Sequence, residues 1–191
     1  MKKIPTIFKR NPERLQELLN ERHPECAWVF EGEGKATRKY DGTAMLIDGG
    51  KFYKRREVKR GKPVPLGFLE VESDPVTGKK VGWVEVDPND PGDRWAMEAY
   101  RPDLKAGTYE LLGPKIQGNP EGFDRHVLLR HAEAEVYSSV PRTMEGIRAW
   151  LSDKDIEGLV FHHPDGRMGK IKKRDFGMKR REEYKQEKLV R

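Results

Sequence analysis

Six charged residues stand at or beside the ends of short apolar runs, where a strand would meet a turn. They are Lys39, Arg55, Glu110, Glu157, Lys170 and Lys172. An uncharged lysine amine can act as a nucleophile, and fixed cations can stabilise a phosphoryl group during its transfer. Taken singly, each residue has a simpler explanation, because charged side chains commonly keep the ends of strands soluble. Their chemistry therefore depends on whether the fold brings them together.

Lys39 lies in the run Arg38-Lys39-Tyr40-Asp41-Gly42. A lysine before Asp-Gly is usually a charged residue that precedes a tight turn, so this short motif is weak evidence of function. Lys170 and Lys172 alternate with Ile171, which in a strand places both amines on one face and Ile171 toward the core. Alone, this pattern indicates a solvated basic face.

Hairpins are the elements expected to position these residues. From Ala36 the sequence becomes extended, with alternating apolar residues and Gly, Pro, Asn or Asp at the turns. The expected hairpins pair residues 44–47 with 52–55, 68–71 with 81–86, and 158–161 with 168–172. Further strands are expected at 108–112 and 127–129. Lys39 would then lie just before the first strand pair.

Three helices and a helical tail are also expected. Asn11-Pro12-Glu13 has the residue types of a helix start, and Leu15, Leu18 and Leu19 follow as an apolar stripe. The other expected segments are a short helix from Asp90-Pro91 through Trp95, a helix capped by Thr143 that carries Ile147, Trp150 and Leu151, and a charged helical tail from Phe176.

The chain contains no internal repeat, low-complexity block or Gly/Ser linker. Strands interrupted by a few helices therefore predict a single α+β domain over residues 1–191, built of packed antiparallel sheets with flanking helices. Residues 178–191 would form a charged tail.

The composition narrows the possible partners and location. A formal net charge of +6 suits a polyanionic partner, because clustered Lys and Arg release counterions from phosphate backbones. Cys26 is the only cysteine, which excludes an internal disulfide and favours a reducing compartment, most simply the cytoplasm. No run of ~18 apolar residues occurs, so no membrane span is expected.

Taken in order, the charged residues resemble the motif series of the covalent nucleotidyltransferase superfamily, which contains nucleic-acid ligases and RNA capping enzymes. Lys39-Tyr40-Asp41-Gly42 is similar to the nucleophile motif, and Lys170-Ile171-Lys172 is similar to the final two-lysine motif. The resemblance implies that Lys39 forms the covalent bond to AMP and that Lys170 and Lys172 bind the nucleotide.

The remaining motif residues match in the same way. Arg55, sixteen positions after Lys39, resembles the arginine that contacts the nucleotide, with Arg56 as the alternative. Glu110 resembles the glutamate that binds the ribose, and Glu157 the glutamate that binds the metal.

The resemblance is narrower still to small RNA ligases related to the vertebrate 5′-3′ RNA ligase. It is carried by residues 82–86, 111–120 and 170–177 and spans roughly 35–177. It implies an ATP-grasp-like DNA/RNA ligase adenylation domain. Many relatives carry an added OB-fold or helical domain, but only residues 178–191 follow the last motif, so no separate OB-fold is expected. The implied activity is ATP-dependent joining of RNA with 5′-phosphate and 3′-hydroxyl ends, with Mg²⁺ or Mn²⁺ as the metal, in RNA repair.

Two features leave parts of this hypothesis open. Arg38 stands where RNA ligases often have an acidic residue that reads the adenine amino group, and the aromatic that stacks on the base is either His131 or Tyr137. The alternatives to an RNA ligase are a DNA ligase, a capping-type guanylyltransferase, or an inactive RNA-binding module.

Other groups of residues that could suggest a functional site are better explained by structural roles. Residues 31–35, Glu-Gly-Glu-Gly-Lys, lack the spacing and terminal Ser or Thr of a P-loop. His162 and His163 would point to opposite sides of a strand, which disfavours a metal pair. Trp83 and Trp95 are expected in the core rather than on a nucleic acid.

Overall fold

The structure is a computed structural model that describes residues 1–180. The chain forms two compact units, and each is built from two separate stretches of sequence. Unit 1 contains Met1–Lys3 and Asp41–Glu133, and the described part of unit 2 contains Ile4–Tyr40 and residues 134–180. The boundary at Tyr40 and Asp41 therefore falls inside the Lys-x-Asp-Gly motif.

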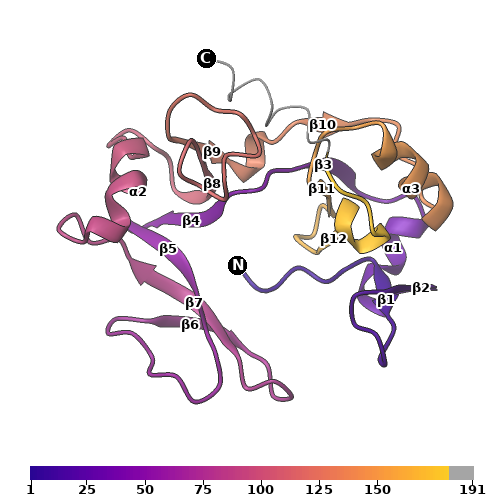
Figure 1. Cartoon of the computed structure of the whole chain (residues 1–191), viewed down its shortest axis with the longest axis horizontal. Coiled ribbons are helices and arrows are strands. Elements are labelled where there is room, and N and C mark those ends of the chain that lie inside the picture. The colour runs from indigo at the N-terminus through magenta and orange to yellow at the C-terminus, as the bar shows by residue number, and fades with distance from the viewer. Residues whose placement is uncertain (181–191) are drawn as a thin grey trace. The chain divides into compact units, whose positions relative to one another are not determined.

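Unit 1 is built on a six-stranded antiparallel sheet in the order β6-β7-β5-β4-β8-β9 (Figure 1). Its strands are β4 (Thr43–Asp48), β5 (Lys51–Val58), β6 (Leu69–Ser73), β7 (Lys80–Glu85), β8 (Gly107–Leu112) and β9 (Val127–Arg130). One face of this sheet carries Met45, Ile47, Phe52, Tyr109 and Leu111, which pack with Ala96 and Ala99 of α2 (Arg94–Ala99). We call this the α2 face.

Unit 2 is built on a four-stranded antiparallel sheet in the order β10-β3-β11-β12. Its strands are β3 (Lys35–Lys39), β10 (Val136–Tyr137), β11 (Gly158–His162) and β12 (Met168–Lys172). Ala36, Leu159, Phe161 and Ile171 pack from one sheet face into the core, together with Val29 of α1 (Ala27–Phe30), Ile147 and Leu151. The last two come from α3 (Met144–Ser152), and we call this the core face.

The smaller elements of unit 2 flank its sheet. A two-stranded hairpin joins β1 (Phe8–Arg10) to β2 (Leu18–Arg22). The 3₁₀ helices along the chain are Pro24–Cys26, Pro91–Asp93, His131–Glu133 and Lys173–Phe176. Among the described residues, no helix is long and apolar enough to cross a membrane.

Most of the expected elements are confirmed, and the described chain is an α+β fold with antiparallel sheets and few helices. The three expected hairpins are β4–β5, β6–β7 and β11–β12. Thr143 caps α3, because its hydroxyl accepts a hydrogen bond from the Gly146 amide at 3.1 Å. Lys39 is the last residue of β3 and comes just before β4.

The helix expected from Asn11 is wrong. The Asn11 side chain accepts a hydrogen bond from the Glu13 amide at 2.9 Å, which closes a local turn, and Leu18 begins strand β2. Leu15 is 68% exposed whereas Leu18 packs against the unit 2 core, so the leucines do not form one buried stripe. Pairing with β1 determines the structure here, because three leucines are too few to stabilise a helix alone.

The helical tail expected from Phe176 is also wrong where the structure describes it. Phe176 ends the 3₁₀ helix Lys173–Phe176, and Gly177 follows in a left-handed conformation with φ 71°, which terminates the turn. Residues 178–180 are not helical. Residues 181–191 of that expected tail lie outside the described residues.

Candidate functional site

Strand register places three of the predicted lysines on one face of the unit 2 sheet. Lys39 of β3 pairs with Gly158 of β11, which in turn pairs with Lys172 of β12. Lys170 pairs with Val160 one step along the same face. Directly paired residues project from the same side of a sheet, so these lysines lie opposite the core face. The expectation that Ile171 faces the core is confirmed, since it is fully buried.

Glu157 joins Lys39 and Lys172 into a compact ion cluster. Its Oε2 lies 2.5 Å from the Nζ of Lys39, and its Oε1 accepts a hydrogen bond from the Nζ of Lys172. The three side chains are only 11–20% exposed. Burial alone would raise the pKa of Glu157, but the two ammonium groups outweigh burial and hold that pKa below its ordinary value. The carboxylate therefore stays ionised between two cations.

Gly158 makes this cluster sterically possible. A Cβ at this position would lie 2.1 Å from the carbonyl oxygen of Ile171 and 2.7 Å from the Cα of Lys172. Only glycine allows β12 to approach β11 so closely beside Glu157. The Glu-Gly pair of the sequence therefore has a structural reason, because the glycine brings the strand that carries Lys172 within reach of the glutamate.

Arg38 and Tyr137 project from the opposite side of the sheet to Lys39. Arg38 pairs with the fully buried Leu159, lies with its guanidinium carbon 4.9 Å from the centre of the Tyr40 ring, and approaches Glu135 at 3.7 Å. Tyr137 packs edge-on to Trp150 in the core. Burial, and to a lesser extent Glu135, raises the pKa of Tyr137 to about 12. Neither side chain shares a face with Lys39.

Glu110 lies at the centre of a hydrogen-bond network in unit 1. Its Oε1 accepts a hydrogen bond from the Gly42 amide at 3.0 Å, and its Oε2 lies 2.8 Å from the Nε2 of His131. The other ring nitrogen of His131 lies 3.0 Å from the hydroxyl of Thr108. A Cβ on Gly42 would come within 2.3 Å of the Leu111 carbonyl oxygen, so glycine is required where β4 begins beside β8.

Arg55 shares a sheet face with Glu110, whereas Arg56 does not. The register pairs Arg55 with Trp83 and Ala44 with Glu110, and places all four on the face opposite the α2 face. The Nη1 of Arg55 donates a hydrogen bond to the Met1 carbonyl at 2.6 Å. Burial lowers the pKa of Arg55, and nearby carboxylates, Glu110 among them, partly offset this shift.

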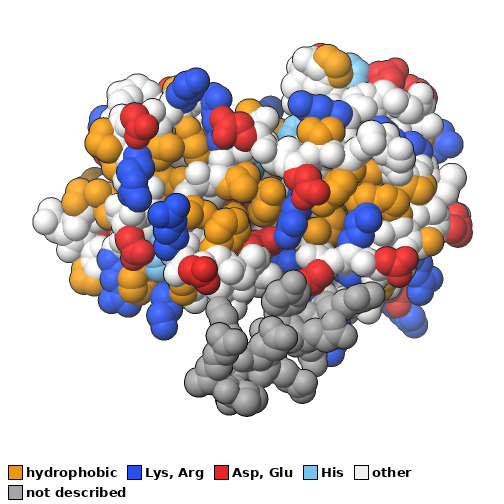
Figure 2. All heavy atoms as spheres, turned by 90° about the horizontal axis from the view of Figure 1, so that it is seen from above, with side chains coloured by type: hydrophobic (Ala, Val, Ile, Leu, Met, Phe, Trp, Pro, Cys, Tyr) orange, Lys and Arg blue, Asp and Glu red, His pale blue; other side chains and the backbone are white. Residues whose placement is uncertain are grey.

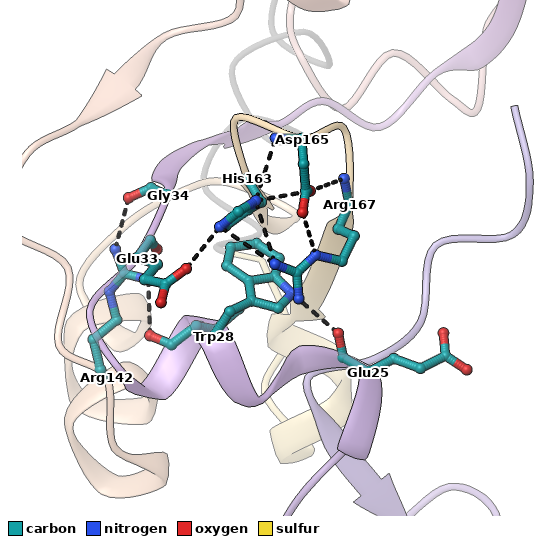
Figure 3. A network of polar contacts seen from close by, with 9 residues as sticks. Glu25, Trp28, Glu33, Gly34, Arg142, His163, Asp165 and Arg167 are labelled. Carbon is teal, nitrogen blue, oxygen red and sulfur yellow. Dashed lines mark hydrogen bonds and ion pairs between the residues drawn. The ribbon is translucent and has the colours of Figure 1, made fainter.

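The histidine next to the end of β11 belongs to a structural network rather than to the lysine cluster (Figure 3). His163 lies between Glu33, 2.6 Å from its Nε2, and Asp165, 2.7 Å from its Nδ1. The backbone amide of Arg167 and the His163 ring lower the pKa of Asp165 to about 2. His162 points elsewhere, with its Nε2 3.0 Å from the Thr37 hydroxyl. The two histidines thus engage different partners, as their alternation in sequence predicts.

Arg142 extends the same network and fixes the segment that leads into β3. Its guanidinium donates hydrogen bonds to the carbonyl oxygens of Glu33 and Gly34 at 3.1–3.3 Å (Figure 3). It also donates one to the Val29 carbonyl oxygen at 3.0 Å and lies over the Phe161 ring. The chain before β3 is therefore held on both sides, by Arg142 and by His163. This arrangement anchors the start of the strand that carries Lys39.

Among the described residues, the carboxylate in contact with Lys39 is that of Glu157, and the carbonyl oxygen of Tyr40 lies 3.4 Å from the Lys39 Nζ. The described residues contain no group of three His, Cys, Asp or Glu side chains that could hold a metal ion. Mg²⁺ often binds through one or two carboxylates together with substrate phosphates, and it keeps several waters. Glu157 is therefore compatible with a metal that arrives with a nucleotide.

Sequence reasoning did not find several of these contacts. Thr108 and Glu121 have no role in the motif series, yet Thr108 positions His131 and Glu121 accepts a hydrogen bond from the Asp41 amide at 3.0 Å. These partners are separated by 23 and 80 residues along the chain. No local pattern could reveal them. From the sequence, His131 is a candidate only for the aromatic residue that stacks on the base.

The sequence is similar to RNA ligase 1 from three vertebrates. It is 31% identical to the zebrafish (Danio rerio) protein over 85 residues, which are 40% of this chain and 26% of that protein. It is 27% identical to the rat (Rattus norvegicus) protein and 28% identical to the mouse (Mus musculus) protein, with 65% of this chain and 46% of each relative covered. The chain thus spans less than half the length of these curated relatives. No profile of a known protein family matches it.

Proposed function

We propose that the chain is an ATP-dependent RNA ligase of the covalent nucleotidyltransferase superfamily, and that Lys39 carries AMP as a covalent intermediate. The Lys39–Glu157–Lys172 cluster is the observation that supports this proposal most strongly. Lys39 and Glu157 both belong to the motif series, and they are in contact although they lie 118 positions apart in sequence. The similarity to vertebrate RNA ligase 1 also supports a ligase that acts on RNA.

The first step would transfer AMP from ATP to the protein. The Nζ of Lys39 attacks the α-phosphorus, a nitrogen–phosphorus bond forms, and the bond to the bridging oxygen breaks so that pyrophosphate leaves with the electron pair. Lys170 and Lys172, on the same sheet face, would stabilise the negative charge of the phosphates. Glu110 would bind the ribose and Arg55 would contact the nucleotide, in keeping with the sheet face that they share.

Lys39 must lose a proton before it can attack. Without nucleotide, the Nζ of Lys39 donates a hydrogen bond to the Glu157 carboxylate at 2.5 Å. Glu157 and the phosphates would hold Mg²⁺ or Mn²⁺, which would neutralise part of the phosphate charge. With Glu157 turned away from Lys39, the positive charges of Lys172 and Lys170 would disfavour the ammonium form and favour the nucleophilic amine.

Two further transfers would complete the joining reaction. The 5′-phosphate oxygen of an RNA end attacks the phosphorus of the lysyl-AMP, which releases Lys39 and forms an adenylated 5′ end. The 3′-hydroxyl of a second end then attacks the 5′-phosphorus, a phosphodiester bond forms, and AMP leaves. RNA repair, in the cytoplasm, is the biological role that we propose.

Covalent labelling distinguishes this function from its alternatives. The wild-type protein, incubated separately with α-labelled ATP, α-labelled GTP and adenylate-labelled NAD in the presence of Mg²⁺, should retain label from ATP alone. Label from GTP would indicate a guanylyltransferase, and label from NAD a different nucleotide donor. If no nucleotide leaves a label, the proposal is wrong and the RNA-binding module is the better description.

A further inference from the structure

An extension of unit 1 carries a cluster of three exposed basic side chains. It comprises the ends of β5, β6 and β7 and the loop 59–68 between β5 and β6, which extends beyond the sheet away from α2 (Figure 1). Lys59, Arg60 and Lys62 are all exposed in this loop. Their side chains make no hydrogen bond or ion pair with any residue in the described part of the chain. We call these three residues the basic loop.

The carboxylates near the basic loop are already occupied. Glu57 pairs with Lys79 at 3.1 Å, and Glu70 pairs with Lys80 at 2.7 Å. The Glu72 carboxylate accepts a hydrogen bond from the Lys3 amide, and Asp74 accepts hydrogen bonds from the amides of its own turn. Nearby acidic groups are therefore committed elsewhere and leave the charge of the basic loop uncompensated.

Mixed charge is the rule on the face of the molecule shown in Figure 2, where Lys and Arg side chains alternate with Asp and Glu. Exposed lysines and arginines elsewhere in the chain often follow that rule. Lys9 pairs with Glu21, Arg14 with Glu17, and Lys51 with Glu85. Some other cations of the described chain, such as Lys35, Lys105 and Lys115, also lack an ion-pair partner, but they are separated along the sequence. Three such cations within four residues therefore form a local concentration of positive charge.

An aromatic ring, that of Phe68, lies close to the basic loop along the chain, just before the start of β6. The ring of Phe68 occupies the space over Gly82, where a Cβ would come within 2.6 Å of its edge. Arg56 pairs with Gly82 and therefore projects from the same sheet face as this ring, and both side chains remain at least partly exposed. Phe68 and Arg56 provide surfaces on which nucleic-acid bases can stack, next to cations that bind phosphates.

We infer that this extension, with Lys59, Arg60 and Lys62 on phosphates and Phe68 beside Arg56 under the bases, binds single-stranded RNA. The inference rests on the proposed function for the identity of the nucleic acid, and it adds a binding surface that the motif series does not include. Charge complementarity selects a polyanion, and the partly exposed ring of Phe68 favours one with unstacked bases. An anionic lipid surface is the rival occupant, because Val64 and Leu66 of the same loop are also exposed.

The expected effect follows from counterion release. Each phosphate contact with a single strand contributes about 0.7 to the slope of log affinity against log salt. Three lost contacts should therefore lower that slope by about 2 and weaken binding roughly 100-fold in 0.1 M salt. Substitution by Gln retains the Cβ and Cγ methylene groups, which matters for Arg60 because these carbons lie against the turn at Gly78.

The experiment measures fluorescence anisotropy of a short labelled oligouridine with a 5′-phosphate, without ATP, over a series of salt concentrations. It compares the wild type with the variant Lys59→Gln, Arg60→Gln, Lys62→Gln. The charge-matched control is Lys9→Gln, Arg14→Gln, Lys51→Gln, which removes three exposed cations that have acidic partners. We expect the basic-loop variant alone to lose affinity and salt dependence, with an unchanged melting temperature.

Equal affinities and slopes for the two variants would overturn the inference. The inference would also be overturned if the basic-loop variant bound RNA as well as the wild type but was no longer retained on vesicles of anionic phospholipid. That result would identify a lipid surface as the occupant. AMP labelling is measured in parallel and should be unchanged in the basic-loop variant. Absence of labelling in every protein would refute the proposed function, whereas the anisotropy result would still decide whether the extension binds RNA.

Discussion

The substitution Glu157→Gln should destabilise the protein markedly at neutral pH. Glu157 receives charge-assisted hydrogen bonds from Lys39 and Lys172, and it is 91% buried as a residue. Its replacement by an amide leaves two ammonium groups close together without a counter-charge. Breaking a buried ion pair in this way costs roughly 3–5 kcal/mol. Because both lysines keep 15–20% of their surface exposed, we expect a loss near the lower limit, about 3 kcal/mol.

The pH dependence of this loss provides a second, independent test. The pKa of Glu157 is lower in the folded protein than its ordinary value of 4.5. Its ionised form therefore contributes stability in full above pH 4.5, and this contribution disappears as the pH falls through the lower folded pKa. Gln does not titrate, so the difference in stability between wild type and variant should narrow below pH 4.5.

Chemical and thermal denaturation followed by circular dichroism measure both effects. A loss of about 3 kcal/mol corresponds to a decrease in melting temperature of roughly 6–12 °C for a chain of this size. Glu85→Gln is the matched control, because Glu85 also pairs with a strand lysine, Lys51, but both side chains are more than half exposed. It should change stability little. If Glu157→Gln were as stable as this control at pH 7, the reasoning would be refuted.

Three other measurements test separate parts of the structure. Lys172→Gln should slow AMP labelling of Lys39 by at least about tenfold, because the variant lacks one cation that stabilises the transferring phosphoryl group. The variant should remain folded. Labelling at the wild-type rate would contradict this role of Lys172. Cys26 should react slowly with a disulfide reagent at pH 8 until the protein is denatured, because burial, followed by the charge of Glu25, raises its pKa to about 11; equally fast reaction of the native protein would contradict its burial. Midway between pH 10 and pH 12, Tyr137→Phe and the wild type should have nearly the same phenolate absorbance, because burial keeps Tyr137 neutral at that pH. If the variant lost the absorbance of one ionised tyrosine, Tyr137 would not be buried as described.

Local sequence patterns predicted the hairpins well, because alternation and turn residues act over a few neighbours. The β11–β12 hairpin and the alternation of Lys170, Ile171 and Lys172 are examples. The same local reasoning failed at Asn11, where a side-chain turn and pairing with β1 replaced the expected helix. Whether a short apolar stripe forms a helix depends on what it packs against, and the sequence does not display that partner.

The charged residues of the candidate site were found only as an ordered series. Which of them touch depends on strand pairings between distant segments, such as β3 with β11. That pairing makes Glu157 a partner of Lys39 and Lys172, and it also turns Arg38 away from the face that carries Lys39. Arg55 and Arg56 differ in the same way, since adjacent strand residues alternate between faces and only Arg55 shares one with Glu110.

Mass spectrometry of the intact and digested protein, after incubation with ATP and Mg²⁺, tests the central proposal most directly. We expect a mass increase equal to one AMP, located on Lys39 within its peptide, and no increase in the Lys39→Ala variant. The adduct should disappear when pyrophosphate is added in excess, because the transfer is then reversed. Absence of an adduct from the wild type, or an undiminished adduct in Lys39→Ala, would contradict the assignment of Lys39 as the nucleophile.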